Sequence, residues 1–144
     1  MKRLRISLKR NPALEVDRVS IGHLKLVYVI CADKKVAYPK GRSRIVYIGT
    51  TQNGIDRVAQ SAATRSDEVL KLHGVNSFQV RIVTSTPRQH LKTWHKLERA
   101  LILYFRAIYG AVPKRNGTGK NMAWRDEREL FVAKRLRDII EDLS

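Results

Sequence analysis

Five polar residues stand at positions where packing alone would not require them. Tyr28 and Tyr47 lie in two strand-like runs, LVYVIC and IVYIG, and Arg57 falls on the polar side of the helix expected next. Glu98 lies beside the apolar stripe of a longer helix, and Asn116 lies in the loop that follows it. Each has an ordinary explanation: aromatic packing, a solvated cation, a salt bridge or a turn. Together they could form a site.

Glu98 gives the clearest chemical indication. A carboxylate that is partly removed from water is costly unless a cation neutralises it. A divalent metal is one such cation, and one of the many arginines is another. Position alone leaves both interpretations of Glu98 open, a metal ligand or a salt bridge.

Two runs that read as strands carry the tyrosines. Residues 24–31 are rich in β-branched and aromatic side chains and are apolar on both faces, which predicts a central strand covered on both sides. Residues 44–49 are predicted to form a second strand, antiparallel to the first. Residues 32–43, between them, contain proline, glycine and several cations, and are predicted to be an exposed basic loop.

Helical and strand periodicity predict the remaining elements. Thr51 or Asn53 can cap a helix that follows the second strand. A third strand is expected at FQVRIVT, then a long helix over about 88–109 and an amphipathic helix over about 124–143. This order predicts an α+β fold with a small three-stranded, mainly antiparallel sheet flanked by helices.

The length of the chain indicates one domain. A chain of 144 residues can bury about 68–70% of its unfolded surface. We expect a single domain over 1–144, with a basic lead-in at 1–23 and a core at 24–118. A short strand or helix around 14–21 is an option within the lead-in.

Net charge restricts the partners. The chain has 29 Lys and Arg against 13 Asp and Glu, a net charge of +16, which indicates a polyanion such as nucleic acid. We expect no membrane association, because no segment is uniformly apolar for the ~20 residues that a spanning helix needs. The lead-in lacks the apolar core of a secretory signal, and the single cysteine, Cys31, reads as a small buried hydrophobe. A reducing, cytoplasmic location is expected.

Two basic clusters are candidates for contact with DNA phosphates. GRSR contributes Arg42 and Arg44, and PKR contributes Lys114 and Arg115. Such clusters are either solvated or bound to phosphates, and the net charge favours the second interpretation. A dimer is one option for the oligomeric state.

The chain order of the five polar residues resembles that of the GIY-YIG nuclease family. LVY, residues 26–28, stands in the place of the first motif, and YIG, residues 47–49, matches the second letter for letter. The arginine, the helix glutamate and the late asparagine follow in the family's order.

Two positions depart from the family pattern. Leu26 replaces the glycine of the first motif. Ser61 stands where many members carry Tyr or His, one turn beyond the arginine. His73 and Tyr38 are the alternatives for supplying that missing contact.

The resemblance implies a metal-dependent DNA endonuclease, acting in restriction, in mobile elements or in repair. Glu98 would hold one Mg²⁺, with Mn²⁺ as a substitute, and Tyr28 would be the general base or relay, with Tyr47 as its hydrogen-bonding neighbour. Arg57 would clamp a phosphoryl oxygen. Asn116 would position the helix of Glu98 or touch substrate, and Gly49 would let a phosphate approach the backbone.

Two non-catalytic classes are the alternatives. One is a nucleic-acid-binding protein that retains the family's fold, which the two departures favour. The other is an ordinary RNA-binding protein, but such proteins display exposed aromatic side chains. Aromatic residues are only 7% of this chain, and the sequence places most of them inside.

Overall fold

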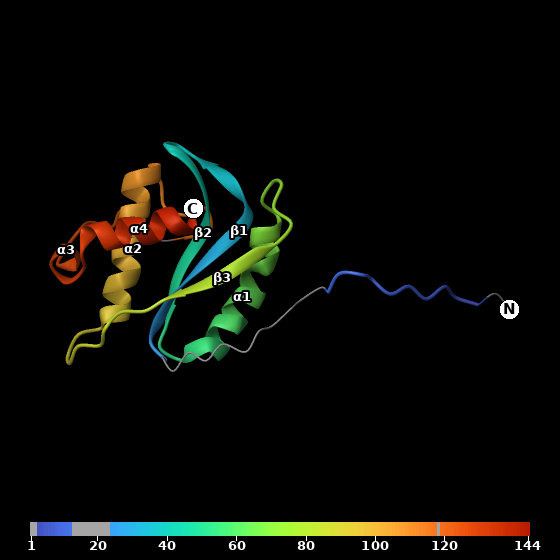
Figure 1. Ribbon diagram of the computed structural model, residues 1–144, viewed down its shortest axis with the longest axis horizontal. Helices are drawn as coiled ribbons and strands as arrows, with labels where there is room; N and C mark the ends of the chain where they lie inside the picture. Colours follow the sequence, from blue (N-terminus) through green and yellow to red (C-terminus); the bar gives the residue numbers. More distant parts are fainter. Residues whose placement is uncertain (1–2, 13–23, 118) are drawn as a thin grey trace.

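A three-stranded antiparallel sheet in the order β2-β1-β3 forms the centre of the structure (Figure 1). The computed structural model describes residues 3–12, 24–117 and 119–144. The predicted α+β class and the predicted small antiparallel sheet are confirmed. The strands are β1 (Leu26–Tyr38), β2 (Gly41–Thr51) and β3 (Phe78–Val83), and the helices are α1 (Gly54–Leu70), α2 (Thr93–Tyr109), α3 (Glu127–Leu130) and α4 (Ala133–Leu143).

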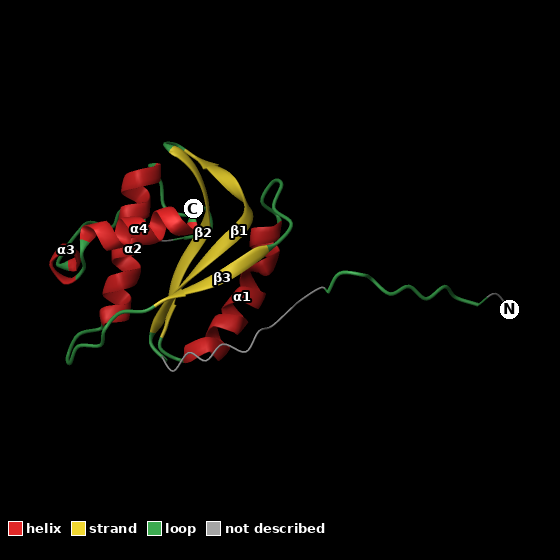
Figure 2. Ribbon diagram, in the orientation of Figure 1, coloured by secondary structure: helices red, strands yellow, loops and turns green. Residues whose placement is uncertain are grey.

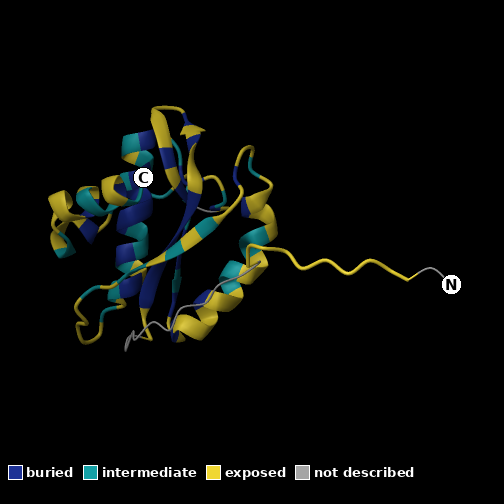
Figure 3. Cartoon of the chain, turned by 45° about the vertical axis from the view of Figure 1, so that its right-hand side comes forward, coloured by how far each residue is buried: buried dark blue, intermediate teal, exposed yellow. Residues whose placement is uncertain are grey.

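Helices cover both faces of the sheet. α1 lies against one face, and α2 and α4 lie against the other (Figures 1 and 2). The first seven residues of β1 are all buried, so the predicted central strand is confirmed, and the buried residues form a band between the helices (Figure 3). Because successive side chains of a strand point to opposite faces, β1 supplies apolar contacts to both helical layers.

The segment predicted to be a basic loop is instead the end of a hairpin. β1 continues to Tyr38 and β2 starts at Gly41, with a break in register between Cys31 and Val36. Val36 and Tyr38 are buried, and the Tyr38 ring meets Phe105 of α2 edge-on at 4.9 Å. These contacts stabilise a strand in a stretch whose proline, glycine and lysines indicated a loop.

The long helix begins at Thr93 rather than near residue 88. His90 has a positive φ of 59°, and a bridge joins Arg88 to Leu91, so this stretch is a turn. The predicted end is confirmed, since Gly110 has the left-handed conformation (φ 80°) that ends a helix. At the start of α1, Thr51 Oγ1 accepts a hydrogen bond from the Asn53 amide at 3.0 Å, but the Asn53 side chain makes no capping bond.

The predicted C-terminal helix over 124–143 is two helices, and a buried ion pair explains the break. Phe131 is extended (φ −126°, ψ 142°) and separates α3 from α4. The fully buried Glu127 accepts from Arg99 Nε at 2.6 Å and from the Arg125 amide at 2.7 Å. This pair attaches α3 to α2.

Three further expectations concern Cys31, the lead-in and the membrane. Cys31 is buried as predicted, and burial raises the pKa of its thiol to about 11. The option of an element around 14–21 lies outside the described residues. None of the helices in the described ranges combines the length and apolar character needed to cross a bilayer.

Replacing Glu127 by alanine should lower the free energy of unfolding by about 2–4 kcal/mol, because it leaves Arg99 without its buried partner. Urea denaturation measures the effect. Glu129→Ala, at an exposed position of the same short helix, is the matched control and should change stability by less than about 0.5 kcal/mol. Equal effects of the two variants would show that the buried pair does not anchor α3.

Candidate active site

Tyr28 and Tyr47 lie side by side on the face of the sheet that α1 covers. Their ring centroids are 5.8 Å apart, with an angle of 41° between the ring planes. Tyr28 pairs with Gly49 across the strands. A Cβ at Gly49 would lie 2.6 Å from the Tyr47 ring and 2.7 Å from the Tyr28 phenol. The glycine therefore makes room for the two rings, rather than leaving the space free for a phosphate as the sequence suggested.

One polar face of α1 meets the tyrosine pair. Ser61 Oγ lies 2.5 Å from the Tyr28 hydroxyl, a hydrogen bond in which either atom can donate. The Arg65 guanidinium lies over the Tyr47 ring, with its Cζ 3.8 Å from the centroid. Ser61 and Arg65 are four residues apart, so they share a helix face. The helix thus contributes a hydroxyl to one tyrosine and a cation to the other.

Ser61, the second departure from the predicted family pattern, makes a hydrogen bond with Tyr28 itself. Tyr38 belongs to the core, where its hydroxyl donates to the Ile45 carbonyl at 2.6 Å and accepts from the Lys114 amide at 3.0 Å. His73 is exposed in the turn after α1.

Arg57 lies four residues before Ser61 and is exposed. Its Nη1 donates to Gln60 Oε1 of the same helix at 3.2 Å. The arginine that the structure brings onto the tyrosine pair is Arg65. Sequence reasoning missed Arg65, and the available signal was its spacing: it lies one further turn along the face that carries Arg57 and Ser61.

Glu98 lies on α2 and is half-buried. Burial raises the pKa of its carboxyl to about 7, although the charge of Arg99 opposes the rise. The pKa of Tyr47 is also raised, to about 12, by burial first and then by Tyr28, while Arg65 opposes the rise and the Glu98 charge adds to it. Of these contributions to the pKa of Tyr47, the charge of Glu98 makes the smallest.

The salt-bridge interpretation of Glu98 does not hold within the part of the chain that the structure describes. The arginine next to it, Arg99, pairs with Glu127 and also donates to the Ala123 carbonyl. None of the ion pairs among these residues involves Glu98. Glu127, which the sequence analysis did not single out, forms an ion pair with Arg99 of α2. Glu98, on α2 itself, forms none of the ion pairs among the described residues.

Asn116 holds β2, not the helix that carries Glu98. Its Oδ1 accepts from the Ile48 amide at 3.0 Å and its Nδ2 donates to the Ile48 carbonyl at 2.9 Å. The Arg115 amide donates to the Val46 carbonyl at 2.9 Å. These bonds pair the loop with the outer edge of β2 on both sides of Tyr47. Asn116 is buried and positions the strand rather than facing a substrate.

The predicted DNA-contacting cations lie in two places. Arg42 and Arg44 are exposed on the hairpin, where Arg42 donates to the Lys35 carbonyl at 3.0 Å. Lys114 is exposed in the loop that pairs with β2, with its ammonium 5.4 Å from the Tyr38 ring centroid. Arg115 is half-buried there, and its Nε is buried without a hydrogen-bond partner.

A magnesium ion at Glu98 would have to take most of its ligands from water and substrate rather than from the protein. No group of three or more His, Cys, Asp or Glu side chains that could hold a metal occurs among residues 3–12, 24–117 and 119–144. Mg²⁺ commonly takes one or two carboxylates and completes its shell with water and substrate phosphate. A desolvated Glu98 without a counter-cation is such a carboxylate.

Comparison of the chain with protein-family models, curated proteins and solved structures found no match. The assignment to the GIY-YIG family therefore stays a prediction from the residues.

Replacing Glu98 by glutamine should stabilise the protein at high pH. The folded-state pKa lies above the ordinary 4.5, so the folded chain binds more protons between about pH 4.5 and 7, and wild-type stability falls as pH rises through that window. A neutral amide avoids this loss. We expect equal stability near pH 4 and a gain of about 1–3 kcal/mol for Glu98→Gln at pH 8, by urea denaturation in EDTA.

Glu129→Gln, an exposed carboxylate on α3, is the control and should show no such pH dependence. If Glu98→Gln gained nothing between pH 4 and pH 8, Glu98 would be ionised without strain and its assignment as a desolvated carboxylate would be wrong.

Proposed function

We propose that the protein is a metal-dependent DNA endonuclease of the GIY-YIG type. The observation that carries the proposal is the pair of tyrosines on adjacent strands, flanked by Ser61 and Arg65 from one helix; a carboxylate on another helix, Glu98, has a raised pKa and takes part in none of the described ion pairs. Ordinary packing explains a buried phenol, but it does not explain two phenols bordered by a hydroxyl and a guanidinium.

Tyr28 is the proposed general base or relay. Hydrolysis of a phosphodiester needs a group that accepts a proton from the attacking water. The Tyr28 hydroxyl would accept that proton, and the hydrogen bond to Ser61 would orient the phenol and offer a route for its own proton.

The arginines are the proposed phosphate-binding groups. A planar guanidinium offers paired donors that match phosphoryl oxygens. Arg65 would hold such an oxygen while its plane rests on Tyr47. Arg57, exposed one turn from Ser61, would leave Gln60 and bind a neighbouring phosphate. The net charge of +16 supports a polyanionic substrate.

Glu98 is the proposed ligand of Mg²⁺, or of Mn²⁺ in its place. Such an ion, when bound, supplies positive charge to stabilise the phosphoryl oxygens and the leaving 3′ oxygen. Glu98 would contribute a half-buried carboxylate on α2, whose pKa burial raises and which takes part in none of the described ion pairs.

A non-catalytic nucleic-acid-binding protein with the same fold is the second candidate. The raised pKa of Tyr47, about 12, favours it, because this phenol stays protonated at neutral pH. The bond between Arg57 and Gln60 also favours it, because the arginine points along its own helix.

Incubating supercoiled plasmid with the wild-type protein and Mg²⁺ or Mn²⁺ tests the proposal. We expect nicking that EDTA abolishes, and a loss of at least ~100-fold in rate for Tyr28→Phe, the range expected when a general base is removed. Glu98→Gln should nick as slowly as the wild type does in EDTA, because the metal ligand is lost. Tyr104→Phe and Glu129→Gln are the matched controls, since these residues lie outside the site, and should nick at the wild-type rate.

Arg57→Ala and Arg65→Ala distinguish the two arginines, since the larger loss of nicking identifies the one that binds the reacting phosphate. If the wild-type protein bound the plasmid and left it intact with both metals, the second candidate would be correct. If Glu98→Gln nicked as fast as the wild type, the metal assignment would be wrong.

A further inference from the structure

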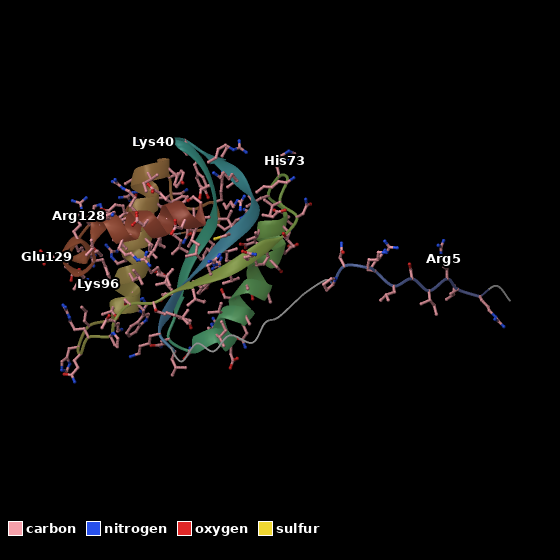
Figure 4. The ribbon with its side chains drawn as sticks, viewed as in Figure 1. Arg5, Lys40, His73, Lys96, Arg128 and Glu129 are labelled. Atoms are coloured by element: carbon pink, nitrogen blue, oxygen red, sulfur yellow. The ribbon has the colours of Figure 1, made fainter. Side chains whose placement is uncertain are left out.

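The N-terminal segment, residues 3–10, has the alternating pattern of a β-strand but pairs with no strand of the described sheet. Leu4, Ile6 and Leu8 are 93%, 95% and 96% exposed, and each is flanked by Arg, Ser or Lys. The segment leads away from the sheet and helices on the side of α1, where Figure 4 labels Arg5. Strict alternation of apolar and polar residues is typical of a strand that buries one face.

The sheet has one open edge within the described residues. The outer edge of β2 is occupied by Arg115 and Asn116, which bond its backbone groups. β3 pairs with β1 from Phe78 to Val83, and no described strand pairs with its other side. An open edge of this kind is a template for another strand.

A groove runs beside that open edge. It has a volume of about 660 Å³ and lies between α4 on one side and β3 with the loop after it on the other. Its apolar lining includes Val83, Leu97, Leu136 and Ile139. A strand added to β3 would direct every second side chain into this groove.

We propose that residues 3–10 of one chain add as a strand to the open edge of β3 in a second chain. Leu4, Ile6 and Leu8 then fill the groove, and the backbone bonds the free edge. The exchange is reciprocal, so two identical contacts close a symmetric dimer. The proposal concerns the outer edge of β3 and the groove beside it, and it does not depend on nuclease activity.

The charges of the groove select this orientation of the segment. Arg81, Arg88 and Arg135 line the groove, together with Asp142. Cations of the segment would be repelled if they faced these arginines. In a strand, the three apolar residues enter the groove and the flanking cations point to the opposite face of the sheet, whereas a helix would mix the two sets.

The occupant is a second copy because the segment lies apart from its own groove. It extends on the side of α1, whereas the groove borders α4 (Figure 1). Each chain carries a net charge of +16, so the dimer forms against electrostatic repulsion. Added salt screens that repulsion and strengthens the dimer, whereas salt weakens binding of a basic arm to DNA.

Light scattering after size-exclusion chromatography tests the proposal with the full chain at about 100 µM and at two salt concentrations, about 50 and 500 mM NaCl. The wild type should have twice the chain mass of 16.6 kDa, with more dimer at high salt. The variant Leu4→Ser/Ile6→Ser/Leu8→Ser should be a monomer under the same conditions, as should the groove variant Ile139→Lys. The control Arg3→Ser/Arg5→Ser/Lys9→Ser changes the opposite face and should remain a dimer.

A wild-type monomer at about 100 µM overturns the proposal, whether the segment then docks on its own β3 or contacts DNA. A dimer that persists in the triple serine variant also overturns it, because the contact then lies elsewhere. Since these three leucine and isoleucine positions are exposed, the serine variant keeps its fold and decides the question even if Ile139→Lys unfolds.

Discussion

Where β1 and β2 run side by side, the backbone of Gly49 lies directly beneath the rings of Tyr28 and Tyr47. A Cβ there would come within 2.7 Å of both rings, well inside the 3.5–4.0 Å or so at which carbon atoms pack. The two rings in turn contact α1: the Tyr28 hydroxyl bonds Ser61, and the Tyr47 ring lies against Arg65. Because Gly49 has no side chain, the two tyrosine rings can lie where these contacts with α1 form.

Two glutamates differ in how their charges are compensated. Glu127 is fully buried, but it accepts hydrogen bonds from Arg99 and from the Arg125 amide, and these bonds hold its pKa low despite burial. Glu98, one residue before Arg99, loses that arginine to Glu127 and keeps a raised pKa. In a chain with a net charge of +16, an unpaired and desolvated carboxylate is an energetic cost that a bound cation would remove.

The sequence predicted the small sheet and the two strands that carry Tyr28 and Tyr47, because strand alternation is a local pattern. It failed where contacts between distant segments decide. Residues 32–43 form the end of a hairpin, in which Tyr38 packs against Phe105 of α2. The C-terminal segment forms two helices, and Glu127 of the first pairs with Arg99 of α2. In the sequence, nothing distinguishes Arg65 from the other Lys and Arg residues, 29 in all; its contact with Tyr47 depends on the packing of α1 against the sheet. The bonding partner of Asn116 is the outer edge of β2, which forms only when the strands pair.

The most direct test of the account is the rate of plasmid nicking by Gly49→Ala compared with Gly117→Ala. Gly117 has open space where a Cβ would lie, so its alanine variant is the matched control. The account predicts a folded Gly49→Ala protein, by circular dichroism, that nicks at least ~10-fold more slowly than the wild type, since the displaced rings lose their alignment with α1. Gly117→Ala should retain the wild-type rate. Wild-type nicking by Gly49→Ala would contradict the claim that the close fit of two tyrosines over a glycine forms the active site.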